Sequence, residues 1–300
     1  VLWTVGSSNP NFWGTFFYRN EAVAYLNIII FACAVLYFYH FNQAERRGQS
    51  GGPHLLLFMF VVLLFVSIGL ALSRGGILFG GVMTACFFLA AAARWLFSNS
   101  VRNSILLTLL MGGVLIGAGS LMFQYVDLDD IEKRFGNIEK TIQDADKDAR
   151  ALSTQATWDM AQADVWLGWG AGSFRYIFPK YQKNYPEIFY QRHHPRRGWI
   201  GRKFYHYAHN DVVQFLAEYG IVGCSFLLLA FGYWIWCLLF RASGNVMSAL
   251  MLMIGLAMAL GHAFVDFVYQ SPMCWLALNG LLCVSVKLLS LHHERIKGRA

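Results

Sequence analysis

Seven stretches of this chain are long and apolar enough to cross a lipid bilayer. A helix needs about 20 such residues to span about 30 Å of hydrocarbon. Because lipid offers no partner to backbone N–H and C=O groups, a segment of this kind must satisfy them within a helix. The sequence therefore predicts an all-α, polytopic membrane protein, whose spans are residues 22–41, 55–72, 76–93, 104–123, 219–240, 242–265 and 271–291.

The composition excludes a soluble globular fold. Of the 300 residues, 57% are hydrophobic and only 14% are charged, which is too little charge to cover the surface of a soluble protein. All six cysteines lie inside the apolar stretches, which excludes a disulfide scaffold and a thiolate zinc site. The chain begins at Val1 in what reads as the end of an extracytoplasmic loop, so we expect it to be the C-terminal portion of a longer protein.

Basic residues in the short connections orient the spans. Only Arg19 and Arg74 fall on one side, whereas nine basic residues fall on the other. The side that is richer in lysine and arginine is the cytoplasm, so the long segment 124–208 is extracytoplasmic. The nine residues are Arg46, Arg47, Arg94, Arg102, Arg241, Lys287, Arg295, Lys297 and Arg299.

The chain thus divides into three parts: residues 1–123 with four spans, the extracytoplasmic loop 124–208, and residues 209–300 with three spans and a cytoplasmic tail. Within the loop, apolar residues recur at steps of three and four from Ile131 to Leu152, which predicts an amphipathic helix. A glycine-rich turn follows at 168–172. Residues 175–203 then hold eight basic residues against one acidic residue, Glu187, a balance that suits an anionic headgroup or a phosphorylated glycan better than a nucleic acid.

Two positions in or beside the spans invite a functional interpretation. Arg74 lies between two apolar stretches, where an arginine usually has an anionic partner or a function, although snorkelling or a helix-fixing salt bridge would also explain it. His209 precedes an apolar helical pattern and is predicted at a helix start, where an imidazole tends to stay neutral and can accept a proton. Asn210 and Asp211 could instead simply cap that helix.

Two further groups leave alternatives open. His262 and Asp266 are spaced to meet one turn apart on a helix, either as a structural pair or as catalytic groups. Asp127, Asp129 and Asp130 could hold a divalent cation, but they also suit the start of a helix, which is the simpler interpretation.

These elements follow one another in the order found in the O-antigen ligase and polymerase superfamily, which the sequence resembles over nearly its whole length. The most specific element is the block 209–223, which begins His209-Asn210-Asp211 and continues through Glu218 to Gly220. The other elements are Gly14-Thr15-Phe16, Arg19-Asn20, Ala24-Tyr25-Leu26, Ser73-Arg74-Gly75, Gly168-Trp169-Gly170-Ala171-Gly172-Ser173-Phe174 and Val265-Asp266-Phe267 with Pro272.

The resemblance implies a glycosyltransferase of the type C architecture in the bacterial inner membrane, with its active site facing the periplasm. Such enzymes transfer a glycan, with inversion, from an undecaprenyl-diphosphate carrier to an acceptor hydroxyl. The acceptor is the lipid A core, a growing glycan or a protein, and the products belong to lipopolysaccharide or exopolysaccharide biosynthesis. The resemblance implies membrane lipid as a partner, no nucleic acid, and no metal or other cofactor.

The resemblance also assigns residues. It places His209 and Arg74 in the catalytic role, with Arg74 and Arg175 at the diphosphate. An arginine that the family carries a few residues before Trp158 is absent, and Arg150 lies further upstream. Arg196, Arg197 and Arg202 are further candidates for substrate binding, and Asn210, Asp211, Asp266 and His262 are candidate supporting groups.

A second function class fits part of the same pattern. In a transporter or flippase for an anionic lipid-linked glycan, Arg74, His262 and Asp266 would line a passage through the membrane. That class predicts related half-repeats and broken helices near the middle of the bilayer. The candidate residues here instead gather at one face beside a large loop, which favours the transferase.

Overall fold

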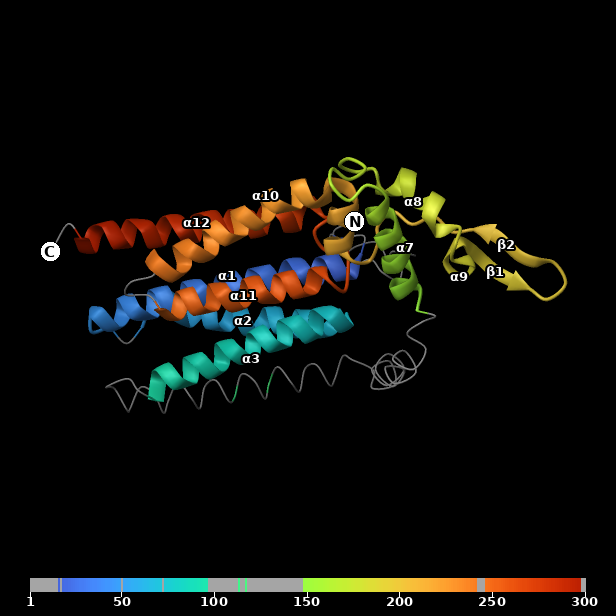
Figure 1. The fold of residues 1–300 in the computed structure, drawn as a ribbon. Coiled ribbons are helices and arrows are strands. Elements are labelled where there is room, and N and C mark those ends of the chain that lie inside the picture. The colour runs from blue at the N-terminus through green and yellow to red at the C-terminus, as the bar shows by residue number, and fades with distance from the viewer. Residues whose placement is uncertain are drawn as a thin grey trace. The chain divides into compact units, whose positions relative to one another are not determined.

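The structure is a computed structural model that describes residues 16, 18–49, 51–71, 73–96, 113, 117, 148–241 and 246–297. These residues form helices and one two-stranded hairpin, and they divide into two compact units (Figure 1). The first unit is built on α1 (Arg19–Arg46), α2 (Pro53–Leu70), α3 (Arg74–Leu96), α11 (Val246–Ala263) and α12 (Pro272–Lys297). The second contains α7 (Ala149–Ala163), α8 (Phe174–Gln182), α9 (Pro186–Phe189), β1 (Tyr190–His194), β2 (Gly198–Arg202), the segment 263–271 and α10 (Asp211–Arg241) as far as Tyr233.

The described helices confirm the polytopic helical class. Five of them, α1, α2, α3, α10 and α11, are long and apolar enough to cross a membrane, and each overlaps a predicted span. Helix α12 carries a shorter apolar part, Pro272–Leu288, at the place of the last predicted span. The predicted span 104–123 lies outside the described residues, apart from two isolated positions.

Helix α1 is the centre of the first unit, and small residues let its neighbours approach it closely. It packs against α2, α3 and α12. A Cβ atom on Gly76 of α3 would lie 1.9 Å from Cγ1 of Val23, and one on Gly80 would lie 2.4 Å from Oδ1 of Asn27. The Asn27 side chain donates a hydrogen bond to the Gly76 carbonyl at 3.3 Å. These glycines therefore serve helix packing, the commonest use of small residues between membrane helices.

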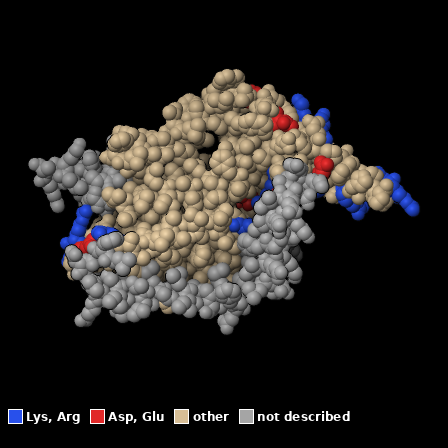
Figure 2. All heavy atoms as spheres, turned by 60° about the horizontal axis from the view of Figure 1, so that its bottom comes forward, with Lys and Arg blue, Asp and Glu red and all other residues tan. Residues whose placement is uncertain are grey.

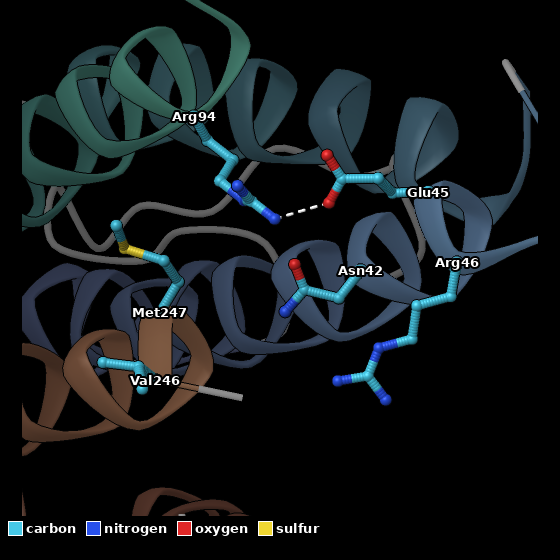
Figure 3. Close-up of a pocket in the computed structure, with 6 residues that line it drawn as sticks. All are labelled: Asn42, Glu45, Arg46, Arg94, Val246 and Met247. Atoms are coloured by element: carbon cyan, nitrogen blue, oxygen red, sulfur yellow. Dashed lines mark hydrogen bonds and ion pairs between the residues drawn. The ribbon is translucent and has the colours of Figure 1, made fainter. Parts of the chain in front are cut away.

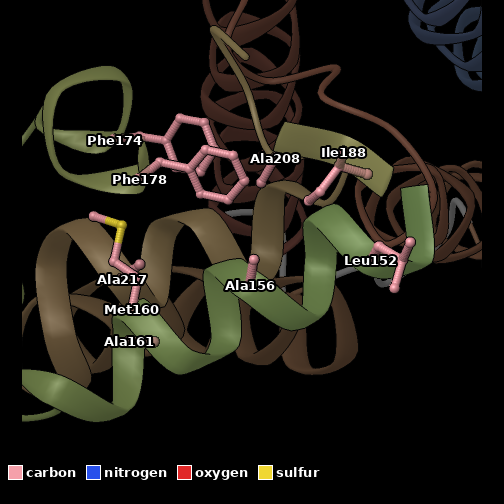
Figure 4. Close-up of a cluster of buried hydrophobic side chains, with 9 residues drawn as sticks. All are labelled: Leu152, Ala156, Met160, Ala161, Phe174, Phe178, Ile188, Ala208 and Ala217. Carbon is pink, nitrogen blue, oxygen red and sulfur yellow. The ribbon is translucent and has the colours of Figure 1, made fainter. Parts of the chain in front are cut away.

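The second unit has its own apolar core, which supports the histidine motif (Figure 4). The Phe174 and Phe178 rings of α8 stack with centroids 4.5 Å apart above the small and flexible side chains of α7. The core contains Leu152, Ala156, Met160, Ala161, Phe174, Phe178, Ile188, Ala208 and Ala217. Ala208 precedes His209 directly and is fully buried, so the core fixes the backbone that presents the histidine.

One expectation for the loop is corrected by the structure. The predicted helical pattern does not run unbroken to Leu152, because Asp148 is extended and caps a new helix by accepting the Arg150 N–H at 3.1 Å. The rest of that pattern, up to residue 147, lies outside the described residues. The basic stretch that follows α9 forms an antiparallel hairpin, in which Tyr190 pairs with Arg202 and His194 with Gly198.

Candidate active site

His209 lies in a strained loop just before α10 and faces a carboxylate. Its backbone has a φ of 60°, in the left-handed region that residues other than glycine rarely adopt. Its Nδ1 atom is 3.6 Å from Oδ1 of Asp266, slightly longer than a direct hydrogen bond. The ring meets Phe267 edge-on at 4.7 Å, and its side chain is 24% exposed, so one edge of the imidazole is held and part of the ring stays accessible.

Asp266 is a buried carboxylate that stays charged. Only 5% of its side chain is exposed, and its Oδ1 accepts the Phe267 N–H at 2.9 Å. Burial by itself would raise the pKa of Asp266, but the interaction with His209 and the positive charge of Arg150 outweigh it and lower the pKa below its usual value. An anionic Asp266 favours the His209 tautomer that carries its proton on Nδ1, which leaves Nε2 free to accept one.

Arg150 is the residue of this cluster that the sequence did not single out as a site residue. Its guanidinium lies 3.7 Å from Oδ2 of Asp266 and donates to the Val265 carbonyl at 3.3 Å. The position is the first turn of α7, upstream of the place where the resemblance led us to expect an arginine. That expectation was the one available signal, because nothing local in the sequence connects Arg150 to Asp266.

Asn210 and Asp211 have different roles, which the sequence could not separate. Asn210 caps α10, since its Oδ1 accepts the Val213 N–H at 3.1 Å. Asp211 is fully buried and binds the segment before α12: its carboxylate accepts the Tyr269 N–H at 2.7 Å and the Gln270 amide at 3.3 Å. Helix α10 begins at Asp211, so His209 lies at the start of this helix as predicted, but one residue before the cap and outside the helix itself.

Tyr205 completes the aromatic wall beside His209. Its ring centroid lies 6.2 Å from that of the imidazole in an edge-on arrangement, and it also packs against Phe178 of the core. Burial raises the pKa of Tyr205, with the negative charge of Asp148 adding to the effect. The phenol is therefore neutral at neutral pH, and it contributes packing and an O–H group rather than a charge.

The glycine-rich turn docks onto a break in α10. At Gly220 the backbone has φ 61° and ψ −174°, so the helix is interrupted there. In an unbroken helix, the carbonyls of residues 217 and 218 would accept from the N–H groups of residues 221 and 222. Here they accept instead from Trp169 at 2.9 Å and Gly170 at 2.8 Å, while Ile221 and Val222 donate to the carbonyls of Val165 at 2.8 Å and Trp166 at 3.1 Å.

The Glu218 carboxylate accepts hydrogen bonds from the second half of the same turn. This buried carboxylate accepts the N–H groups of Gly172 and Phe174, each at 3.1 Å, and the Gln214 amide at 3.3 Å. Successive N–H groups in a glycine turn can form an anion-binding nest. Because Glu218 occupies these donors, we assign the turn a structural role rather than a phosphate-binding one.

Arg74 and His262 belong to the first unit, whereas His209 and Asp266 belong to the second. Arg74 is the exposed first residue of α3, and the hydroxyl of Ser73 caps this helix by accepting the Gly76 N–H at 3.3 Å. The joint catalytic role of Arg74 and His209, which the resemblance implies, stays a prediction. Helix α11 ends at Ala263, so His262 and Asp266 do not lie one turn apart on one helix as expected. The His262 ring stacks on Phe79 with centroids 5.3 Å apart.

The candidate cations of the loop are exposed. The Arg175 guanidinium covers the Tyr176 ring at 4.9 Å, and Arg202 covers Phe189 at 4.9 Å. Arg196 and Arg197 form the turn of the hairpin, and Figure 2 shows lysine and arginine along this projecting part. A charge-rich hairpin of this kind offers donors to an anionic group, and the role of each arginine in substrate binding stays a prediction.

Within the described residues, no metal-ligand cluster gathers at this site, and a pocket in the first unit is lined by other residues. In the part of the chain that the structure describes, no three His, Cys, Asp or Glu side chains gather as metal ligands would. Asp127, Asp129 and Asp130 lie outside the described residues. A pocket of about 300 Å³ lies in the first unit, where Glu45 and Arg94 form an ion pair across it (Figure 3). Its lining residues are Asn42, Glu45, Arg46, Arg94, Val246 and Met247.

Apolar helices long enough to span a membrane, together with a histidine beside a buried carboxylate, define a multi-pass membrane protein with a candidate catalytic centre. The sequence profile of the O-antigen ligase family matches residues 59–228, which is more than half of the chain. The chain belongs to this family and is, in general terms, an O-antigen ligase-like membrane glycosyltransferase. The matched range includes Arg74, His209 and Gly220 and ends before Asp266. No curated protein and no solved structure matches the chain.

Proposed function

We propose that this protein transfers a glycan from an undecaprenyl-diphosphate carrier to an acceptor hydroxyl at the periplasmic face of the inner membrane. The observation that carries the proposal is the contact of His209 with the buried, charged Asp266 in a chain of the O-antigen ligase family. The family supports a lipid-linked glycan donor and an acceptor in general. The lipid A core, a growing glycan and a protein hydroxyl remain the proposed acceptors.

The proposed reaction is a single displacement at the anomeric carbon. The acceptor oxygen forms the new bond on the face opposite the diphosphate, the bond from the anomeric carbon to the diphosphate oxygen breaks, and the configuration inverts. The acceptor proton passes to Nε2 of His209, whose Nδ1 faces Asp266. Asp266 thereby stabilises the imidazolium that forms, in the way that a buried carboxylate supports a general base.

The leaving diphosphate needs positive charge near it. Arginine suits this need, because its planar guanidinium donates two hydrogen bonds at once to phosphate oxygens. We assign Arg74 to this role, with Arg175 as a second cation and the hairpin arginines Arg196, Arg197 and Arg202 as contacts for the glycan or its phosphates. In this proposal Arg150 acts on Asp266 and does not contact substrate, since it lies against the carboxylate and the Val265 carbonyl.

The test replaces each proposed catalytic group in the full-length protein and follows the glycoconjugate in cells. His209→Ala and Arg74→Ala are each expected to abolish transfer, so that the carrier-linked precursor accumulates while the protein still inserts into the membrane. His206→Ala is the matched control for the histidine, because His206 is exposed and lies three residues away in the same loop. It is expected to retain transfer.

Measuring both thermal stability and transfer activity in the His209 variants separates a catalytic from a structural role for this residue. A structural contact would lower the thermal stability of His209→Ala and His209→Gln alike, together with the amount of inserted protein. A general base would leave both stable and inactive. Normal transfer in His209→Ala and Arg74→Ala would overturn the site assignment.

A further inference from the structure

Four apolar side chains at the break in α10 form one exposed surface in the second unit. Trp166 and Leu167 stand on the turn that follows α7, and their side chains are 65% and 70% exposed. Ile221 and Val222, which begin the helix after the break, are 43% and 42% exposed. The backbone bond from Val222 N–H to the Trp166 carbonyl at 3.1 Å joins the two pairs, and we call them the anchor surface.

The anchor surface adjoins the end of a membrane span. From Ile221 to the end of α10 the chain runs for about 20 residues, or about 30 Å of helix, which is the hydrocarbon thickness of a bilayer. The break at Gly220 therefore lies where the span reaches the lipid headgroups. The turn with Trp166 and Leu167 is bonded to the first two residues of that span, so it sits at the same depth.

The backbone of this turn suits contact with lipid. A loop that enters the apolar boundary must have its carbonyls and N–H groups paired, because lipid offers no partners. The carbonyls of Val165 and Trp166 accept from Ile221 and Val222, and the Gly168 N–H donates to the Asp164 carbonyl at 3.0 Å. Tryptophan is also the side chain enriched at the boundary between headgroups and acyl chains.

We propose that the anchor surface inserts into the boundary between headgroups and acyl chains of the bilayer leaflet at this end of α10. The occupant is lipid, because the surface continues directly from a membrane-spanning helix. The insertion holds the glycine-rich turn, and with it the unit that carries His209, at the depth of the headgroups. It does not depend on the proposed reaction, although a diphosphate-linked lipid would present its diphosphate at this depth.

Tryptophan fluorescence in proteoliposomes tests the contact. The full chain is reconstituted in lipid that carries bromine near the headgroup end of the acyl chains, where it quenches tryptophans at that depth. Trp166→Phe is expected to lose part of the lipid-quenched emission of the wild type. Trp199→Phe is the matched control, because Trp199 is also exposed, at 40%, but lies in β2, which pairs with β1. It is expected to keep that emission.

A second measurement does not rely on removing a tryptophan. An environment-sensitive fluorophore is placed at position 167 or at position 204 through a non-natural amino acid; Phe204 is the exposed apolar comparison, at 75%. At position 167 we expect quenching by the brominated lipid and protection from aqueous iodide, and at position 204 the reverse. Equal behaviour of the two positions, or unchanged lipid quenching in Trp166→Phe, would overturn the proposal whether or not the protein transfers glycan.

Discussion

Gly220 offers the sharpest test of the structure, because a continuous α10 and an interrupted α10 predict opposite effects of Gly220→Ala on stability. In an ordinary helix, replacing glycine by alanine stabilises by about 0.5 to 1 kcal/mol. Here the residue has φ 61° and ψ −174°, and a Cβ atom would lie 2.3 Å from the Trp166 carbonyl oxygen and 2.6 Å from the Gly168 nitrogen. Both atoms belong to the backbone and cannot move away as a flexible side chain could.

The expected magnitude follows from the two ways in which the chain could respond to Gly220→Ala. If the break persists, alanine must adopt a strained conformation that costs about 1 to 3 kcal/mol, in addition to the overlap with the turn. If the helix straightens, the Trp169 and Gly170 N–H groups lose their carbonyl acceptors, and each unsatisfied group costs about 1 to 3 kcal/mol. Either way, the free energy of unfolding falls by about 3 kcal/mol.

Thermal unfolding of the purified protein in detergent measures the effect. A loss of about 3 kcal/mol corresponds to a fall in Tm of roughly 10 °C for a chain of this size. Gly232→Ala is the matched control: the residue lies in the same helix, and an added Cβ would have no atom within 4 Å. We expect it to be neutral or slightly stabilising. A Gly220→Ala variant as stable as Gly232→Ala would refute the break and the docked turn.

Three further substitutions test other parts of the structure. Because the pKa of Asp266 is lowered in the folded state, its contribution to stability is present at neutral pH and is lost as the pH falls through its titration. The free energies of unfolding of wild type and Asp266→Asn, measured by chemical denaturation, should therefore converge below about pH 4. Glu218→Gln replaces two carboxylate acceptors by one carbonyl, so it should cost about 1 to 3 kcal/mol and speed proteolysis at the glycine-rich turn. Gly76→Ala should disrupt the packing of α3 on Val23 and reduce the amount of inserted protein, whereas Gly81→Ala, whose nearest neighbour would lie 3.9 Å away, should not.

For each of these three predictions, one outcome would contradict it. If the free energies of unfolding of wild type and Asp266→Asn differ by the same amount at every pH, this would contradict a charged, stabilising carboxylate. Unchanged proteolysis of Glu218→Gln would mean that the carboxylate does not hold the turn. Equal insertion of the Gly76→Ala and Gly81→Ala variants would contradict the close approach of α1 and α3.

The sequence by itself determined the class of the protein and most of its helices. Membrane spans can be predicted from the sequence because transfer into lipid depends on the hydrophobicity of about 20 consecutive residues, which is a local property of the chain. The sequence also offered Asn210 and Asp211 as caps of the helix, since a cap acts within three residues of itself, and Asn210 is the one of the two that caps it. The family motif likewise pointed to His209, because its residues adjoin one another in the chain.

Only the tertiary structure decided which groups meet His209. Asp211 and Asp266 were equal candidates by spacing, and packing placed Asp266 against the imidazole while Asp211 binds Tyr269. Arg150 reaches the same carboxylate from a helix far away in the chain. The break at Gly220 likewise exists because a distant turn supplies the hydrogen bonds that the helix gives up. Such choices depend on contacts between residues remote in the sequence, and no local pattern encodes them.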